Sequence, residues 1–88
     1  MRIQRNQESK KAMERIFCAW LKRYRQEHGM TQEQMARAFM ISCRSYSDLE
    51  NGTSGPSGLT FAMFLTFLSQ EEQKTFLSDL RSEIEKDR

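Results

Sequence analysis

Residues 29–52 contain the start and stop signals of two short helices in close succession. Thr31 is a good N-cap, and Gln34 three residues later completes a capping box that opens a helix. Ser42 can cap the next helix, and Gly52 supplies the glycine that often follows a helix end. Only a tight turn fits between the two helices. The stretch therefore predicts a compact unit of two packed helices, around which the rest of the chain is organised.

Apolar residues before this unit predict a longer helix. Phe17, Trp20 and Tyr24 recur at spacings of three and four, which places them on one helical face. Gly29 provides a left-handed stop. Residues 1–8 have no apolar period, so we expect this segment to fray and the helix to begin just after it.

Two more helices are predicted after the unit. Residues 59–68 are almost wholly apolar, and they favour a central core helix over a strand because no partner strand is nearby. Ser69 and Glu72 form a second capping box, which opens a C-terminal helix over about residues 70–86. The loop 53–58 holds the only proline. The predicted fold class is all-α.

The composition fits one small globular domain, residues 1–88. Hydrophobic residues make up 38% and charged residues 30% of the chain. A chain of this length buries only roughly 60% of its unfolded surface, so a deep substrate cavity is not expected. No apolar run could span a bilayer and no signal core is visible, so we expect a cytoplasmic protein. Two cysteines and one histidine give no metal-site pattern, and no metal or cofactor is expected.

Positive charge is concentrated in the first part of the chain. Residues 1–25 hold eight Lys/Arg against two Glu, a balance of +6, whereas residues 26–88 hold six basic and ten acidic residues, a balance of −4. The basic part could attract a polyanion, or it could be the solvated face of a helix. Charge alone does not separate these interpretations.

Capping, core and terminating residues occur together around the two short helices. They are Leu21, Arg25, Gly29, Thr31, Gln32, Ala36, Ile41, Ser42, Leu49, Glu50, Asn51, Gly52 and Pro56. In this pattern the chain resembles the Cro / lambda-repressor superfamily of helix-turn-helix proteins, also called XRE-like, over about residues 13–68, with the helix-turn-helix at 31–51. The resemblance implies a five-helix bundle of the lambda-repressor-like DNA-binding type, with an additional C-terminal helix.

The resemblance also implies binding to double-stranded DNA, as a homodimer that reads a palindromic operator. In this family the second helix of the unit, here residues 43–51, enters the major groove and its first residues touch base edges. Arg44 is the leading reader, because a guanidinium can donate two hydrogen bonds to guanine; a phosphate contact is the alternative role. The residues carried over as base-facing are Cys43, Arg44, Ser47 and Asp48.

Contacts with the DNA backbone are implied around the same unit, where the family's loop after the second helix offers backbone N–H groups to phosphate. The residues carried over as phosphate-facing are Arg25, Gln32, Ser42, Asn51, Thr53, Ser54 and Gly55. Arg25 and Glu50 also match a family ion pair. The apolar helix 59–68, the C-terminal helix, or both are candidates for the homodimer interface.

Several residues favour a second hypothesis, a protein-interaction module (antitoxin-like or a degenerate helix-turn-helix) that has lost base readout. Asp48 places a negative charge on the face that would meet DNA, and the loop 53–58 has no Lys or Arg. Met40 stands where relatives usually carry glycine, and at a positive φ it would cost about 1 kcal/mol. An enzyme is not expected, because the chain has no phosphate-binding glycine motif and no nucleophile with a base. The leading hypothesis is a sequence-specific, repressor-like transcriptional regulator of a bacterium or phage.

Overall fold

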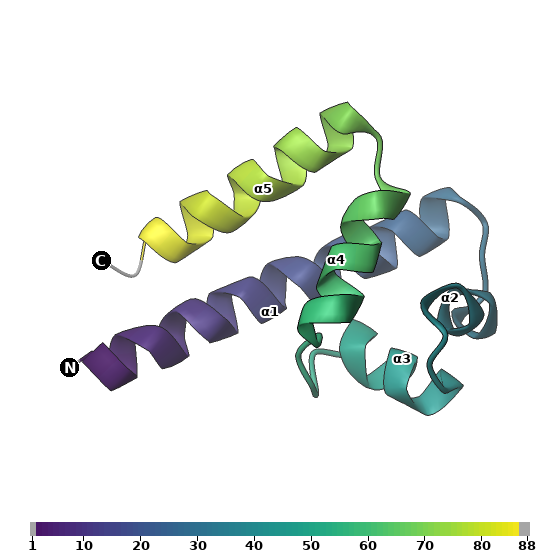
Figure 1. Cartoon of the computed structure of the whole chain (residues 1–88), viewed down its shortest axis with the longest axis horizontal. Helices are drawn as coiled ribbons and strands as arrows, with labels where there is room; N and C mark the ends of the chain where they lie inside the picture. The colour runs from purple at the N-terminus through teal and green to yellow at the C-terminus, as the bar shows by residue number, and fades with distance from the viewer. Residues whose placement is uncertain (1, 87–88) are drawn as a thin grey trace.

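The computed structural model describes the backbone of residues 2–86 and the side chains of residues 8–86, and this part of the chain consists of helices joined by turns and loops, without a strand (Figure 1). Its five helices are α1 (Arg2–Glu27), α2 (Gln32–Phe39), α3 (Cys43–Glu50), α4 (Gly58–Phe67) and α5 (Gln70–Glu85). The predicted all-α class is confirmed. The C-terminal helix, α5, is itself the fifth helix of the bundle.

The helix α1 begins much earlier than the sequence pattern indicated. It starts at Arg2, so the prediction that residues 1–8 fray was wrong for all but residue 1, which lies outside the described residues. The first turns have no apolar face, but they contain no glycine or proline and are rich in Arg, Gln and Glu, which favour helices. Nucleation is the costly step, so a helix nucleated by its packed part extends through such residues at little cost.

One apolar core joins the helices. Phe17, Tyr46, Phe64 and Phe76, from α1, α3, α4 and α5, are each at most 1% exposed, and Met35 joins them from α2. The Phe64 ring meets those of Phe17 and Phe76 edge-on, with centroids 5.4 Å apart in both pairs. Each such pair adds about 0.5–1.5 kcal/mol beyond its buried area. The α2–α3 unit is therefore held on a shared core and not on its own contacts alone.

The helix α5 runs antiparallel to α1, with both ends of the chain toward the same end of the molecule (Figure 1). The Trp20 indole Nε1–H donates to Asp79 Oδ2 at 3.0 Å, and the Trp20 ring meets Phe76 at 5.2 Å. Leu80 is also buried. The apolar face of α5 is thus occupied by contacts within the chain.

The helices α1, α2 and α3 all end in the same hydrogen-bonded turn. The residues in the left-handed conformation are Gly29, Met40 and Gly52, with φ of 61°, 58° and 77°. In each turn the N–H of the next residue donates to the carbonyl five residues earlier, at 2.9, 3.0 and 2.9 Å respectively. This is the Schellman motif, in which glycine is usual because it lacks a Cβ. The positive φ considered for Met40 is therefore present, and its side chain is 79% exposed.

We expect Met40→Gly to raise the free energy of unfolding by up to about 1 kcal/mol in urea titration, because it removes the left-handed strain of a side chain that packs on little. The greater freedom of glycine in the unfolded chain offsets part of this gain. Arg37→Gly, in the last turn of α2, is the control and should lose roughly 1 kcal/mol. A loss of stability in Met40→Gly would contradict the assignment of strain to this turn.

Candidate nucleic-acid interface

The outward face of α3 is defined by what its other face buries. Tyr46 and Leu49 point into the core and are at most 6% exposed. The opposite face holds the four predicted base-facing residues: Cys43 and Arg44, which are exposed, and Ser47 and Asp48, which are half-buried. The structure therefore brings all four onto one face at the start and middle of the helix.

This face carries little net charge. Arg44 is the only basic residue of α3, and Asp48 lies one turn further along the same helix. Residues four apart share one side of a helix, so the two opposite charges offset each other on this face. Attraction to DNA at this face must therefore come from specific hydrogen bonds, or from positive charge elsewhere in the molecule.

Beneath this face the Glu50 carboxylate accepts four hydrogen bonds, which we call the Glu50 network. Arg25 donates from Nε and Nη2 to the two carboxylate oxygens, at 2.8 Å each, so the predicted ion pair is confirmed and is bidentate. The Tyr46 hydroxyl donates at 2.7 Å and the Gln32 amide at 3.2 Å. The network ties α1, α2 and α3 together at a carboxylate whose residue is only 8% exposed.

The network fixes the charge states of its members. Burial alone would raise the pKa of Glu50, but the three donors and the charge of Arg25 outweigh burial and hold this pKa at about 2. Burial raises the pKa of Tyr46, and its hydrogen bond to the carboxylate raises it further. The hydrogen bond to Glu50 likewise raises the pKa of Arg25. These groups keep one charge state across the physiological range, so the network supports structure and not proton transfer.

The Glu50 network occupies much of the donor capacity of two predicted phosphate-facing residues. Arg25 also donates from Nη1 to the Met30 carbonyl at 3.2 Å, so three of its N–H groups are engaged inside the protein. Gln32 is half-buried at the start of α2, and its side-chain amide donates one N–H to Glu50. The structure places both residues at one edge of the α2–α3 unit, where they position α3.

The ends of α3 are fixed by their own side chains. Ser42 Oγ accepts from the Ser45 N–H at 3.0 Å and so caps the helix, as the sequence predicted. At the other end Asn51 Nδ2 lies 3.4 Å from Ser47 Oγ, a weak hydrogen bond. Ser42 and Asn51 are both exposed. Their polar side chains are therefore open to solvent.

The loop after α3 uses its backbone donors differently from the expectation. The N–H groups of Thr53 and Ser54 both donate to the Asp48 carbonyl, at 2.9 and 3.3 Å, so they are not offered to phosphate. They complete the Schellman turn that ends α3. The hydroxyl side chains of these two residues remain exposed, whereas Gly55 is half-buried.

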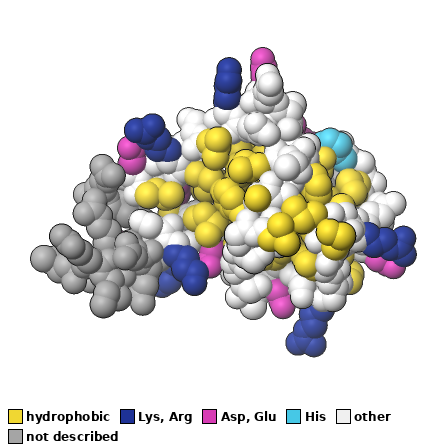
Figure 2. All heavy atoms as spheres, viewed as in Figure 1, with side chains coloured by type: hydrophobic (Ala, Val, Ile, Leu, Met, Phe, Trp, Pro, Cys, Tyr) yellow, Lys and Arg dark blue, Asp and Glu magenta, His cyan; other side chains and the backbone are white. Residues whose placement is uncertain are grey.

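The helix α4 is mostly apolar around its circumference, but only part of it is buried. Thr60 and Phe64 face the core, whereas Leu59 is 70% exposed. Ala62 and Thr66 are also exposed and Met63 is half-buried, so the outer face of α4 is Leu59, Ala62, Met63 and Thr66. Figure 2, viewed from the same direction as Figure 1, shows apolar side chains gathered across the middle of the molecule. A helix that is apolar all round is usually covered on each side.

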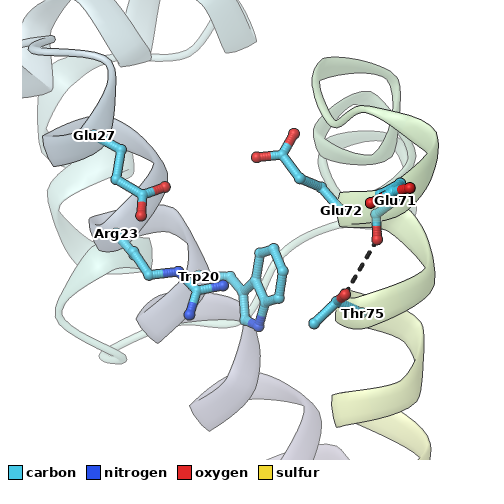
Figure 3. A pocket seen from close by; sticks show the side chains of 6 residues that line it. All are labelled: Trp20, Arg23, Glu27, Glu71, Glu72 and Thr75. Carbon is cyan, nitrogen blue, oxygen red and sulfur yellow. Dashed lines mark hydrogen bonds between the residues drawn. The ribbon is translucent and has the colours of Figure 1, made fainter.

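An open hollow of about 330 Å³ lies between α1 and α5, on the opposite side of α1 from α3 (Figures 1 and 3). The capping hydrogen bond from the Ser69 backbone lowers the pKa of Glu72, so this carboxyl stays ionised. The six lining residues are Trp20, Arg23, Glu27, Glu71, Glu72 and Thr75. Three carboxylates face one guanidinium there, which stacks 4.1 Å over the Trp20 ring, so the local charge disfavours a phosphate.

Neither a metal site nor a membrane-spanning helix is found in the described part of the chain. No group of three or more His, Cys, Asp or Glu side chains is placed there to hold a metal ion. None of the described helices is both long enough and apolar enough to cross a membrane.

Sequence reasoning missed the roles of two polar groups in the Glu50 network. The sequence pattern implied a phosphate contact for Gln32 and gave no polar role to Tyr46, but the structure brings both onto Glu50. The four-residue spacing of Tyr46 and Glu50 was a usable signal, because it places the phenol and the carboxylate on one helix face. The Gln32 contact crosses between helices and had no local signal.

The fold and the geometry of the α2–α3 unit define a helix-turn-helix protein. A family model described as helix-turn-helix matches residues 21–71, and the chain belongs to this family. The resemblance to XRE-like proteins is thereby confirmed. Over 38 residues the chain is 50% identical to an uncharacterized HTH-type transcriptional regulator, YqaF, of Bacillus subtilis (strain 168). That stretch is 43% of this chain and 50% of the relative, so the chain spans half the length of the relative. No solved structure matches the chain.

Proposed function

We propose that this protein is a cytoplasmic, repressor-like transcriptional regulator that binds double-stranded DNA sequence-specifically, with α3 in the major groove. The observation that carries the proposal is the Glu50 network, which fixes α3 against α1 and α2 while leaving Cys43 and Arg44 exposed. A fixed helix with exposed first residues is what groove reading requires. Membership in the helix-turn-helix family supports the same conclusion.

In this proposal Arg44 reads a guanine through a bidentate contact to O6 and N7. Asp48, one turn further along α3, can accept a hydrogen bond from the N4 amino group of a nearby cytosine. Its negative charge then favours cytosine at that position of the site. Cys43 and Ser47 complete the base-facing surface. Contacts with the phosphate backbone of the DNA come from residues at the edges of the α2–α3 unit. These residues are Arg25, Gln32, Ser42, Asn51, Thr53, Ser54 and Gly55.

We propose that the protein binds as a homodimer through the outer face of α4. The occupant is a second copy because the face is apolar at Leu59, Ala62 and Met63, and Leu59 at its start is 70% exposed. The alternative surface, α5, already packs Phe76 and Leu80 inside the chain. Half-sites of such dimers lie about 34 Å apart, which is comparable with the 40 × 28 × 19 Å dimensions of one copy. The operator is then palindromic.

Selection of bound oligonucleotides from a random pool tests this function, with Arg44→Ala as the variant. We expect the wild-type protein to enrich a palindromic site with half-sites one or more helical turns apart. Arg44→Ala should reduce preference for one guanine per half-site by about 5- to 150-fold, which corresponds to 1–3 kcal/mol. Arg81→Ala, on α5, is the control for lost charge and should leave the preference unchanged. No enrichment of any sequence at low salt would refute the proposal.

A protein-interaction role is the second candidate, and the loop after α3 favours it. This loop has no Lys or Arg, and the Thr53 and Ser54 N–H groups are already engaged with the Asp48 carbonyl. Under that reading neither the wild type nor Arg44→Ala selects a sequence, and the exposed apolar face of α4 receives a protein partner instead of a second copy.

A further inference from the structure

The helix α1 runs directly along the loop that follows α3. The Cys18 Sγ atom lies 3.7 Å from the position that a Cβ on Gly52 would take. A Cβ on Gly55 would overlap the side chain of Glu14. Cys18 and Glu14 are four residues apart, so one face of α1 follows the loop from its start toward its middle.

The next residues toward the N-terminus on this side of α1 are Lys10 and Lys11, one turn before Glu14. Both are exposed. The ion pairs found in the described part of the chain join Arg25–Glu50, Arg37–Glu33, Arg81–Glu85 and Lys86–Glu83, and none includes these two lysines. Their charges therefore face solvent without a close carboxylate partner among the described residues.

The helix α1 slants across the molecule, and its N-terminal end lies on the far side of the loop from α3 (Figure 1). In Figure 1 the N-terminal turns of α1 reach the height of α3 but lie at the left, beyond the loop, while α5 lies on the other side of α1. The loop itself offers no Lys or Arg, and the outward face of α3 has little net charge. The first half of α1 therefore adds exposed positive charge, at Lys10, Lys11 and Arg15, that the loop and α3 lack.

We propose that Lys10 and Lys11 form a second DNA-binding surface, which holds backbone phosphates beyond the loop that flanks α3. This inference rests on the proposed DNA binding and adds the part of the protein that supplies its missing positive charge. Each lysine neutralises a phosphate and releases a counterion, and neither reads a base. The two lysines strengthen binding to every sequence alike, whereas Arg44 chooses among sequences.

The test is the double variant Lys10→Gln/Lys11→Gln, with Lys74→Gln/Arg81→Gln on α5 as a control that removes the same charge. Binding to the selected duplex and to a scrambled duplex is measured between 50 and 200 mM salt. We expect the slope of log K against log salt to become shallower by roughly 1.8 in the α1 variant, since each phosphate contact contributes about 0.9. Affinity for both duplexes should fall on the order of tenfold at 0.1 M salt, and their ratio should stay unchanged.

The control variant should keep the wild-type slope, and both variants should keep the wild-type midpoint of thermal unfolding. An unchanged slope in the α1 variant, or an equal change in the control, would overturn the inference while leaving the proposed function intact. If the wild-type protein binds no duplex at 50 mM salt, the proposed function and this inference both fail.

Discussion

Replacing Arg25 with methionine is expected to lower the free energy of unfolding by about 3–5 kcal/mol, because it strands a carboxylate in the protein interior. The Glu50 side chain is only 4% exposed, so water cannot take the place of the guanidinium. Methionine keeps an apolar stem in the space of the arginine stem, which confines the loss mainly to the charge. Tyr46 and Gln32 still donate to the carboxylate, but they carry no compensating charge.

Arg37→Met is the matched control for this experiment. Arg37 is also paired with a carboxylate on its own helix, Glu33, at 3.6 Å, but the two side chains are 80% and 70% exposed. Exposed pairs of this spacing contribute about 0.3–0.5 kcal/mol, so urea unfolding of Arg37→Met should stay close to wild type. A loss below 1 kcal/mol in Arg25→Met would show that water reaches Glu50 and that the pair does not secure α3.

The same pair sets a pH dependence. The pKa of Glu50 is lowered in the folded protein, from 4.5 to about 2, so its stabilisation is complete above pH 4.5 and is lost as the pH falls toward 2. That shift corresponds to about 3 kcal/mol. In Arg25→Met the main donor is gone, so the carboxyl gains less from ionisation. The difference in unfolding free energy between wild type and Arg25→Met should therefore narrow from pH 4.5 to pH 2.

Phe76→Ala is expected to cost about 3–5 kcal/mol, even though residue 76 lies outside the matched helix-turn-helix region, residues 21–71. Phe76 is 0% exposed, and its ring lies 5.2–5.7 Å from the rings of Trp20, Phe61 and Phe64. Removing it opens a cavity between α1, α4 and α5, the centre of the core.

Leu77→Ala provides the comparison, since Leu77 is the next residue on α5 and is 47% exposed. Leu77→Ala should lower the free energy of unfolding by about 1 kcal/mol or less in the same thermal or urea unfolding experiment. Equal effects of the two substitutions would mean that α5 is only loosely attached. The expected difference identifies α5 as part of the domain core and not as an appendage.

Helix boundaries set by local chemistry were predictable from the sequence. The structure has the predicted helix ends at the predicted residues: the capping boxes at Thr31 and Ser69 and the caps at Ser42 and Gly52. Each of them depends only on residues within one turn. The start of α1 was not predictable in this way, since propagation from a packed helix leaves no local mark in a polar segment.

The candidate site was predictable only in part. The Arg25–Glu50 pair followed from the family resemblance, and its bidentate geometry agrees. The engagement of Gln32 with Glu50, and of the loop N–H groups with the Asp48 carbonyl, depends on how α2 and the loop lie against α3. Such contacts arise from tertiary packing, and no spacing along the chain encodes them.

The early start of α1 affects the conformational entropy that the chain would lose in the proposed binding of DNA by Lys10 and Lys11. With 26 residues, α1 is a single rod of about 39 Å, close to the longest dimension of the molecule, 40 Å. Arg25 near one end fixes α3, and Lys10 lies about 22 Å away on the same rod. A positive charge carried by a rigid rod is already positioned before binding, so it loses less conformational entropy than the same charge on a flexible arm.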